Sequence, residues 1–348
     1  MANMAAPKKI LIVGPSWVGD MVMAQTLFIL LKNKYPDCLI DVLAPRWSEP
    51  LLARMPEVYR SVVMPIGHGE LAIGKRMALG RGLAQQGYDQ AIVLPNSLKS
   101  ALIPFFADIP VRIGWRGEMR FWLVNDIRLL IKDRYPLMIE RFAALAYLPN
   151  ADLPKDLPRP RLEVVPEQVA HLAQGKGLND VPFLALCPGA EFGPAKRWPE
   201  EHYAAVAKHY LAKGWKVVLF GSAKDQPVGE SIRQAISPEQ QRDCLNLCGT
   251  TSLAEAIDLM SLAAAVVSND SGLMHIAAAL NRPLAVVYGS TSPDFTPPLS
   301  DQVVVERLGL ECSPCFKREC PLEHLNCLKQ LEPARVIEGL EKMLESAA

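Results

Sequence analysis

The stretch at residues 263–280 constrains the fold more than any other part of the sequence. Residues 263–267 form a short run of small and β-branched apolar residues without alternation, which is typical of a strand buried on both faces of a parallel sheet. Polar residues follow at 268–272, and a helical segment then covers 273–280. A buried strand that leads through a polar loop into a helix is the building unit of an open α/β sheet.

The loop after this strand has the features of an anion-binding site. Ligands of open α/β sheets bind at the carboxyl ends of the strands, and a helix N-terminus there offers unpaired N–H groups and a partial positive charge. We therefore expect Ser271 and Gly272 to bind a phosphate, with Asp270 and His275 beside them. A turn whose aspartate only caps the helix would have the same residues, so the pattern alone leaves both interpretations open.

The composition fits two soluble domains. Half of the 348 residues are hydrophobic, and the 37 lysines and arginines balance the 37 acidic residues, which argues against a nucleic-acid partner. The start, MANMAAPKKILIVG, does not resemble a signal peptide, and no apolar run approaches the roughly 20 residues that span a bilayer. We therefore expect a cytoplasmic protein whose eight cysteines are mostly reduced.

The first half of the chain alternates strands and helices, as in a Rossmann-type sheet. We predict strands at 9–13, 39–43, 61–64, 90–94 and 111–113, and helices at 21–34 and 70–86. No G-x-G-x-x-G motif follows any of these strands, which weakens the case for a dinucleotide site.

Asp20 follows a glycine pair whose spacing imitates a phosphate-binding P-loop. Gly14 and Gly19 have that spacing, but Asp20 stands where the loop needs a lysine, and a carboxylate would repel a triphosphate. At a helix N-terminus the dipole would keep Asp20 ionised and able to accept a proton. The alternative is a plain helix cap.

Basic and aromatic residues are interleaved after the polar loop at residues 95–100. The basic residues are Lys99, Arg112, Arg116, Arg120, Arg128, Lys132 and Arg134, and the aromatic ones are Phe105, Phe106, Trp115, Phe121 and Trp122. Such a mixture can mark an anionic partner or a membrane surface. It can equally be a solvated face on which arginine stems cover core aromatics.

A proline-rich polar stretch at residues 149–166 divides the chain, and we predict domains at 1–160 and 161–348. The second half resumes the alternation. Strands are predicted at 183–187, 216–220, 264–267 and 284–288, and helices at 200–213, 224–235, 252–261 and 333–346. The last helix is amphipathic and could pack back onto the first domain.

Loops rich in glycine, hydroxyl and lysine side chains follow the strands of the second half. They cover residues 188–199, 221–225, 248–252 and 269–272. The carboxyl ends of parallel strands meet at one edge of a sheet, so these loops should converge there.

Together, these motifs resemble the ADP-heptose lipopolysaccharide heptosyltransferases, which are family 9 glycosyltransferases with the GT-B fold. The matching motifs are WVGDM at 17–21, PGA at 188–190, KRWP at 196–199, FGS at 220–222, CGTT at 248–251 and NDSGLMH at 269–275. Residues 312–321 look most like the branch that adds the second heptose of the inner core. The resemblance covers nearly the whole chain and implies an α/β fold with two Rossmann-like parallel-sheet domains facing a central cleft.

The resemblance also implies roles for individual residues. Asp20 on the first domain would be the catalytic base, and Lys196 on the second would contact the donor phosphates. Relatives often carry an acidic residue for the ribose after the FGS motif. In this chain two residues separate that motif from the next acidic residue, Asp225, to which we assign the ribose contact. The full expected donor-binding set is Lys196, Gly221, Ser222, Asp225, Thr250, Thr251, Asp270, Ser271, Gly272 and His275.

The implied reaction moves L-glycero-D-manno-heptose from ADP-heptose to the first heptose of heptosyl-Kdo2-lipid A. The chain has no Asp-x-Asp motif, so the charge that neutralises the diphosphate must come from Lys196, Arg197 and the N–H groups of Ser271 and Gly272, without a metal. Direct attack by the acceptor oxygen predicts inversion, and we expect no cofactor.

The implied acceptor is a phosphorylated glycolipid at the inner face of the cytoplasmic membrane. We therefore expect the enzyme to associate peripherally with that membrane. The residues expected to bind the acceptor are Asn96, Lys99, Arg112, Arg116 and Arg120.

Other functions remain open on the residues alone. The same fold could carry the heptosyltransferase that adds the first heptose, or a nucleotide-sugar 2-epimerase. A non-catalytic protein that binds sugar nucleotides is a third alternative, and a dehydrogenase fits least because the glycine fingerprint is missing.

A cysteine cluster near the C-terminus could hold a structural zinc ion. Cys312, Cys315, Cys320 and Cys327 lie within sixteen residues, and His324 lies among them. The spacing lacks the paired C-x2-C knuckles of common zinc modules, and reduced cysteines can simply pack. We therefore expect no catalytic metal here, and a structural one only as the less favoured alternative.

Overall fold

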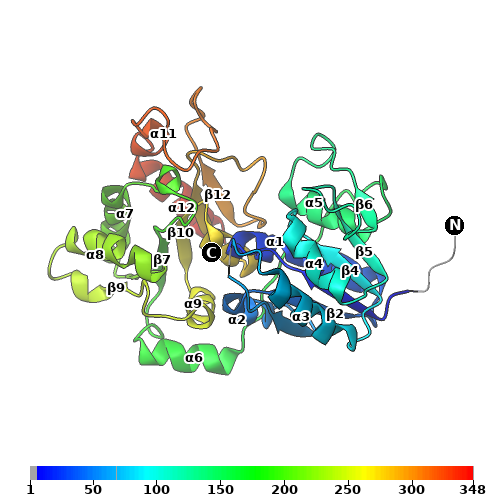
Figure 1. The fold of residues 1–348 in the computed structure, drawn as a ribbon. Coiled ribbons are helices and arrows are strands. Elements are labelled where there is room, and N and C mark those ends of the chain that lie inside the picture. The colour runs from blue at the N-terminus through cyan, green and yellow to red at the C-terminus, as the bar shows by residue number, and fades with distance from the viewer. Residues whose placement is uncertain (1–5, 68, 348) are drawn as a thin grey trace. The chain divides into compact units, whose positions relative to one another are not determined.

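The computed structural model describes residues 6–67 and 69–347. The first five residues of the N-terminal stretch that does not resemble a signal peptide therefore lie outside the described residues. The chain divides into two compact units, Met1–Pro160 and Arg161–Ala348. Each unit has its own six-stranded sheet in which every strand pair is parallel (Figure 1).

The sheet of the first unit has the strand order β3-β2-β1-β4-β5-β6. Its strands are β1 Lys9–Val13, β2 Leu39–Ala44, β3 Arg60–Val63, β4 Gln90–Val93, β5 Val111–Trp115 and β6 Asp126–Arg128. Its helices are α1 Val18–Lys34, α2 Glu49–Leu52, α3 Ile73–Ala84, α4 Leu98–Phe106 and α5 Met138–Ala143, with short 3-10 turns at Arg46–Ser48 and Ala144–Ala146.

The sheet of the second unit has the order β12-β11-β10-β7-β8-β9, which repeats the topology of the first. Its strands are β7 Phe183–Cys187, β8 Lys216–Leu219, β9 Cys244–Asn246, β10 Ala265–Asn269, β11 Leu284–Val287 and β12 Val303–Glu306. Its helices are α6 Pro166–Gly175, α7 Glu200–Ala212, α8 Gln226–Gln234, α9 Leu253–Met260, α10 Gly272–Ala279, α11 Asn326–Lys329 and α12 Pro333–Ala347, with 3-10 turns at Pro194–Lys196, Ala223–Asp225 and Gln241–Asp243.

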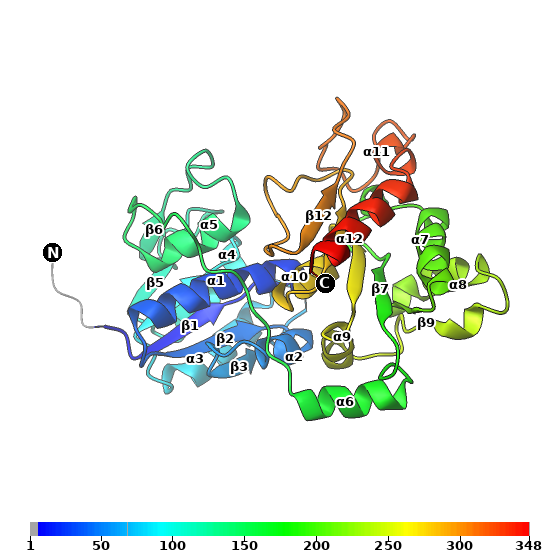
Figure 2. The ribbon, with the colours of Figure 1, turned by 180° about the vertical axis from the view of Figure 1, so that it is seen from behind.

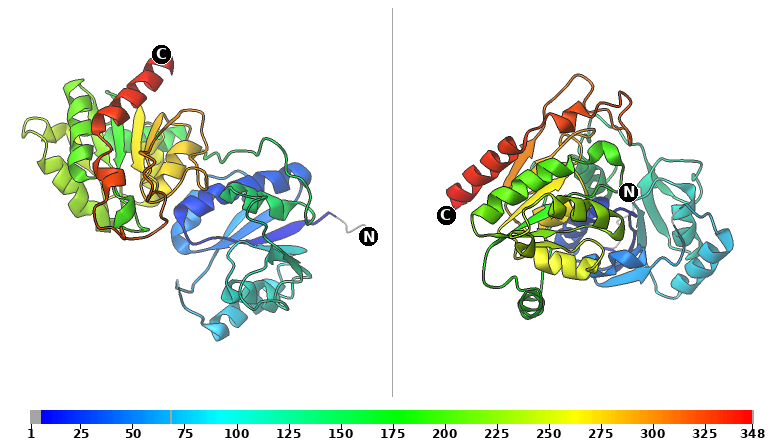
Figure 3. Two further views of the ribbon diagram at one scale, coloured as in Figure 1. Left: turned by 90° about the horizontal axis from the view of Figure 1, so that it is seen from above. Right: turned by 90° about the vertical axis from the view of Figure 1, so that its left-hand side faces the viewer.

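Helices cover both faces of each sheet, because strands buried on both sides need apolar partners on both sides. In the first unit α1 packs with α5, and α3 packs with α4. In the second, α7 and α12 pack together on one face while α10 lies against β10 and β11 (Figure 3). Figure 2 shows α12 alongside β12, and it contacts β11, β12 and α7 of its own unit.

Most predicted strands agree with the structure, and the differences have local causes. Ser268 and Asn269 belong to β10 rather than to a loop, because they continue the ladder opposite Val286 and Val287. The edge strands β6, β9 and β12 were missed: β6 and β9 have only three residues each, and β12 is only partly buried. Helix α1 begins at Val18 and not at Met21, so Asp20 lies inside its first turn.

Candidate functional site

In both units the strand order reverses at one point, and loops at such a switch point form the ligand site of an open α/β sheet. In the second unit the switch lies between β7 and β10, and in the first between β1 and β4. The loops that follow β7 and β10 carry Lys196 and Asp270, and the loop that follows β4 carries Asn96. Asp20 lies in the first turn of α1, directly after the loop that follows β1. The expected site residues therefore lie in or directly after the loops that the topology favours.

Lys196, Asp270 and Thr291 form the charged centre of the second unit. The Lys196 ammonium donates to Oδ2 of Asp270 at 2.6 Å, and the Thr291 hydroxyl donates to the same oxygen at 2.5 Å. Asp270 is almost fully buried, whereas Lys196 and Thr291 are partly exposed. The buried carboxylate thus holds the lysine in a fixed position without sealing it from solvent.

Asn269, the last residue of β10, fixes the loop that carries Lys196. Its side-chain amide donates to the carbonyl of Pro188 at 2.7 Å, and its Oδ1 accepts from the backbone N–H of Trp198 at 3.0 Å. The Trp198 indole in turn donates to the carbonyl of Leu331. One buried amide therefore joins both ends of the 188–198 loop to the neighbouring strand.

Helix α10 directs its N-terminus to the same edge. Ser271 is its N-cap in extended conformation, and its side chain does not cap the helix. Backbone N–H groups in this first turn suit an anion because they lack carbonyl partners within the helix. His275 lies in the first turn of α10, and its burial lowers its pKa to about 4, so that the ring is neutral near pH 7.

Asp225 is packed between two glycine loops. Its Oδ2 accepts from the backbone N–H and the hydroxyl of Ser222 at 2.9 and 2.7 Å, and Arg197 lies 3.7 Å from Oδ1. A Cβ at Gly189 or Gly221 would lie within 3 Å of the Asp225 side chain, so only glycine lets these loops approach it. The carboxylate organises the 221–225 loop.

Thr250 and Thr251 follow the short strand β9 and lie beside the 221–225 loop. Both hydroxyls donate to the carbonyl of Leu247, at 3.1 and 3.3 Å. The backbone N–H of Gly249 donates to Gly221, which joins the two loops. The threonine oxygens keep lone pairs that can accept a hydrogen bond from a ligand.

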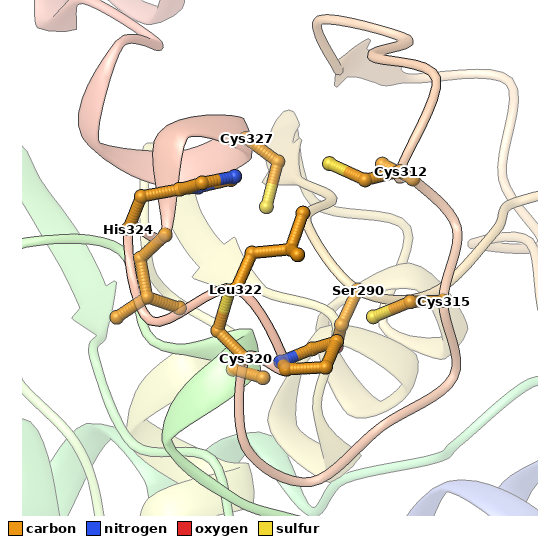
Figure 4. Close-up of a pocket in the computed structure, with 11 residues that line it drawn as sticks. Ser290, Cys312, Cys315, Cys320, Leu322, His324 and Cys327 are labelled. Carbon is orange, nitrogen blue, oxygen red and sulfur yellow. The ribbon is translucent and has the colours of Figure 1, made fainter.

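The four clustered cysteines surround a small cavity of about 20 Å³ (Figure 4). Backbone N–H groups, first that of Leu325, lower the pKa of the Cys320 thiol, whereas burial raises that of Cys327. Within residues 6–67 and 69–347, no three His, Cys, Asp or Glu side chains are arranged to hold a metal ion.

The loop that carries these cysteines is hydrogen-bonded to the loop of Lys196 and to the loop of Thr291. Its Arg318 carbonyl accepts from the backbone N–H of Ala195 at 3.0 Å, next to Lys196. Its Phe316 N–H donates to the carbonyl of Ser290 at 2.7 Å, next to Thr291. The cysteine loop therefore holds the backbone next to Lys196 and Thr291, the two hydrogen-bond partners of Asp270.

In the first unit, Asp20 lies in the first turn of α1 and is half-buried. The helix has no side-chain cap at Trp17, so a carboxylate in this turn is favoured by the helix dipole. Asn96, on the loop after β4, is exposed at the same edge of the sheet.

The expected acceptor residues fall into two groups. Arg120 is only 1 % exposed and donates to the carbonyls of Pro95, Ser97 and Trp115, and to Oδ1 of Asn96. Arg112 is half-buried and donates to the carbonyls of Ile109 and Leu123. These two arginines hold backbone in place, whereas Asn96 and Arg116 are exposed and Lys99 is partly exposed.

Thr291 and the structural role of Asn269 were missed by the sequence analysis. Thr291 follows the predicted strand at 284–288, so the argument applied to the other polar loops would also have found it. Asn269 was grouped with the loop, because side-chain hydrogen bonds between distant segments leave no periodic signal.

Known proteins of one family resemble this chain over most of its length. The model of glycosyltransferase family 9 (heptosyltransferase) matches residues 76–326. Lipopolysaccharide heptosyltransferase 2 of Salmonella typhimurium is 52 % identical over 97 % of this chain and 98 % of its own length. Lipooligosaccharide heptosyltransferase 2 of Haemophilus influenzae is 56 % identical over 86 % of this chain and 88 % of its own. The structure of ADP-heptose lps heptosyltransferase II from E. coli superposes with a TM-score of 0.89 at 48 % identity, covering 97 % of this chain and 99 % of that one.

The chain therefore belongs to glycosyltransferase family 9, the heptosyltransferases, and has their GT-B fold. Within the family it groups with the type 2 enzymes. The predicted fold class and enzyme class are confirmed, and the alternatives of an epimerase, a dehydrogenase or a non-catalytic binding protein are wrong.

Proposed function

We propose that this enzyme transfers L-glycero-D-manno-heptose from ADP-heptose to the first heptose of the lipopolysaccharide inner core, with heptosyl-Kdo2-lipid A as acceptor. The observation that carries the proposal is the similarity to type 2 heptosyltransferases over nearly the whole chain, 52 % with the Salmonella typhimurium enzyme. The loops at the switch point of the second unit have the charge that a diphosphate donor needs.

Lys196 and the N-terminus of α10 would neutralise the departing diphosphate. Charge that develops on a leaving group is stabilised most by donors fixed in advance, and Asp270 fixes Lys196 in this way. Thr250, Thr251, Ser222 and Gly221 would line the nucleoside side of the donor, with Asp225 shaping that loop.

The positive charge supplied by the protein makes a catalytic metal unnecessary. The chain lacks the Asp-x-Asp motif that holds a metal in many glycosyltransferases. Lys196 and the first turn of α10 would neutralise the departing diphosphate in place of that metal. We expect transfer in the presence of EDTA at the rate measured without it. A loss of activity that only added divalent cation restores would contradict this mechanism.

Asp20 would take the proton of the acceptor hydroxyl as its oxygen attacks the anomeric carbon. Direct attack inverts the configuration at that carbon without a covalent intermediate, so a β-linked donor would give an α-heptoside. The transition state resembles an oxocarbenium ion, and the carboxylate of Asp270 would also favour it.

The acceptor is a glycolipid, so the enzyme would act from the cytoplasm at the inner membrane surface. No helix in the described part of the chain is long and apolar enough to cross a bilayer. Asn96 and Arg116, which are exposed, and Lys99, which is partly exposed, are the side chains expected to meet acceptor phosphates.

The test is an assay with purified enzyme, ADP-heptose and two acceptors. Heptosyl-Kdo2-lipid A should gain one heptose with release of ADP, whereas Kdo2-lipid A should gain none. Transfer to Kdo2-lipid A would assign the enzyme to the addition of the first heptose. ADP release without any acceptor product would contradict the proposal altogether.

A further inference from the structure

Five large apolar side chains stand exposed near the carboxyl ends of β5 and β6. We call them the exposed apolar cluster: Met119, Phe121, Trp122, Leu129 and Ile131. Trp122 is 86 % exposed and Met119 is 81 % exposed. The surface of a soluble protein seldom carries a group of large exposed apolar side chains unless that group binds a partner.

The two segments of the cluster start from adjacent points of the sheet. Trp115 at the end of β5 pairs with Arg128 at the end of β6, and the backbone N–H of Arg116 donates to the carbonyl of Arg128 at 2.6 Å. The segment with Met119 to Trp122 follows the first strand, and that with Leu129 and Ile131 follows the second. The cluster therefore belongs to one corner of the first unit.

Arg120 anchors this corner to the loop expected to bind the acceptor. Its guanidinium donates to the carbonyl of Pro95 at 2.6 Å and to Oδ1 of Asn96 at 3.3 Å. Its neighbours Met119 and Phe121 stay outside, because the buried arginine fixes the backbone between them. Gly117 also packs on this loop, where a Cβ would lie 2.5 Å from the carbonyl of Asn96.

Basic side chains accompany the cluster. Arg116 and Lys132 are exposed within the same two segments. Two acidic residues are exposed there as well: Glu118, whose carboxylate accepts from the backbone N–H of Leu98, and Asp133. Exposed tryptophan beside lysine and arginine suits the interface of an anionic bilayer, where the ring enters the headgroup layer and the cations meet lipid phosphates. The chain has no net charge, which argues against a nucleic acid as the partner of this surface.

We propose that the exposed apolar cluster, with Arg116 and Lys132, docks the enzyme on an anionic phospholipid surface beside the acceptor loop. The inference rests on the proposed function, which puts the acceptor in such a surface. Docking there would bring Asn96 and Lys99 to the headgroup level and raise the local concentration of acceptor.

Vesicle binding tests the proposal without any turnover. Wild type should co-sediment with vesicles of phosphatidylcholine and phosphatidylglycerol, less with phosphatidylcholine alone, and less as salt is raised. Trp122→Ser and Met119→Ser should each weaken binding about tenfold, because each removes a large apolar contact. Lys132→Glu should weaken binding only to the anionic vesicles.

Matched controls are Leu148→Ser and Tyr59→Ser, which remove exposed apolar side chains of the same unit outside the cluster. They should bind vesicles like wild type, and equal losses in these variants would overturn the proposal. So would wild type that fails to bind anionic vesicles. Self-association that Trp122→Ser abolishes, without vesicle binding, would show that a second copy covers the cluster.

A comparison of two acceptor forms separates this inference from the proposed function. Trp122→Ser should transfer heptose normally to a delipidated acceptor and more slowly to acceptor in vesicles. If wild type does not act on either acceptor, the proposed function fails whatever the vesicles show. If wild type acts on both and Trp122→Ser matches it on both, the function stands and the docking surface is wrong.

Discussion

At the scale of single residues, Asp20 has the clearest expected effect. Asp20→Asn keeps the shape of the side chain and its position in the first turn of α1, but removes the group that accepts the proton. We expect kcat to fall by about 10² or more while ADP binding is unchanged. Steady-state kinetics and a binding titration would measure both.

Asp37→Asn is the matched control, because Asp37 is an exposed aspartate of the same unit just beyond the end of α1. It should have wild-type kcat. Turnover of Asp20→Asn within a few-fold of wild type would remove Asp20 from the role of base.

Thr291 should matter through Asp270. Thr291→Val keeps the shape and removes the hydroxyl that donates to Asp270 at 2.5 Å, so the carboxylate loses one of the two partners that orient it toward Lys196. A hydrogen bond to a charged group is worth about 1.5–3 kcal/mol, so we expect donor KM to rise about tenfold or more. Thr291→Ser should restore the donor KM, because it restores the hydroxyl. Equal kinetics of the valine and serine variants would refute this role.

His275 gives the fold a pH dependence of known sign. Its pKa is about 4 in the folded protein and near 6.5 when unfolded, so the unfolded state binds the proton first as the pH falls. Stability should be fully present above pH 6.5 and be lost progressively between pH 6.5 and 4. Between pH 7 and pH 5 the loss from this group should be about 2 kcal/mol.

Urea unfolding of wild type and His275→Gln at the two pH values would isolate this contribution. The variant has no imidazole to protonate, so its stability should fall about 2 kcal/mol less over the same interval, whatever its offset at pH 7. The same pH dependence in both proteins would show that the His275 ring is not kept neutral by burial.

At the scale of elements, the contact between the cysteine loop and the Lys196 loop can be tested at Gly193. A Cβ there would overlap the carbonyl oxygen of Arg318, so Gly193→Ala must push the two loops apart. Since Ala195 and Lys196 lie two and three residues further along the same loop, we expect donor KM to rise several-fold with acceptor KM unchanged. Gly175→Ala in α6 is the control, because its Cβ would meet no atom within 4 Å. Unchanged donor KM in Gly193→Ala would mean that the cysteine loop does not position Lys196.

The sequence predicts elements well where burial leaves a pattern. The central strands β1, β4, β7 and β10 each contain an apolar run, so their positions could be read from the sequence, although the polar end of β10 was expected in a loop. The edge strands could not, because β6, with residues Asp126–Arg128, has neither length nor a hydrophobic face.

Site residues were predictable where they follow a strand and not where they act through distant contacts. Asp270 was expected from its loop position and Lys196 from the family resemblance, but the hydrogen bond between them joins residues 74 positions apart. Arg120 shows the opposite error: its charge indicated a ligand contact, yet burial turns its guanidinium toward backbone carbonyls. The sequence shows that a residue is charged, but not whether its side chain points into the protein or to the solvent.

At the scale of the whole molecule, each unit has its own sheet and its own apolar core. The expected phosphate ligands all belong to the second unit, whereas Asp20 belongs to the first. Nucleotide alone should therefore bind and stabilise the second unit, because binding lowers the free energy only of the state that carries the site.

Hydrogen exchange with mass spectrometry can test this division. ADP should slow exchange in the loops after β7 and β10 and at the start of α10, with little change in β1, β4 and the first turn of α1. Lys196→Ala should weaken ADP binding and abolish this protection at the same ADP concentration, whereas Asp20→Asn should retain it. Protection by ADP that centres on the first unit would contradict the assignment of the phosphates to Lys196 and α10, since a ligand protects the backbone groups it contacts.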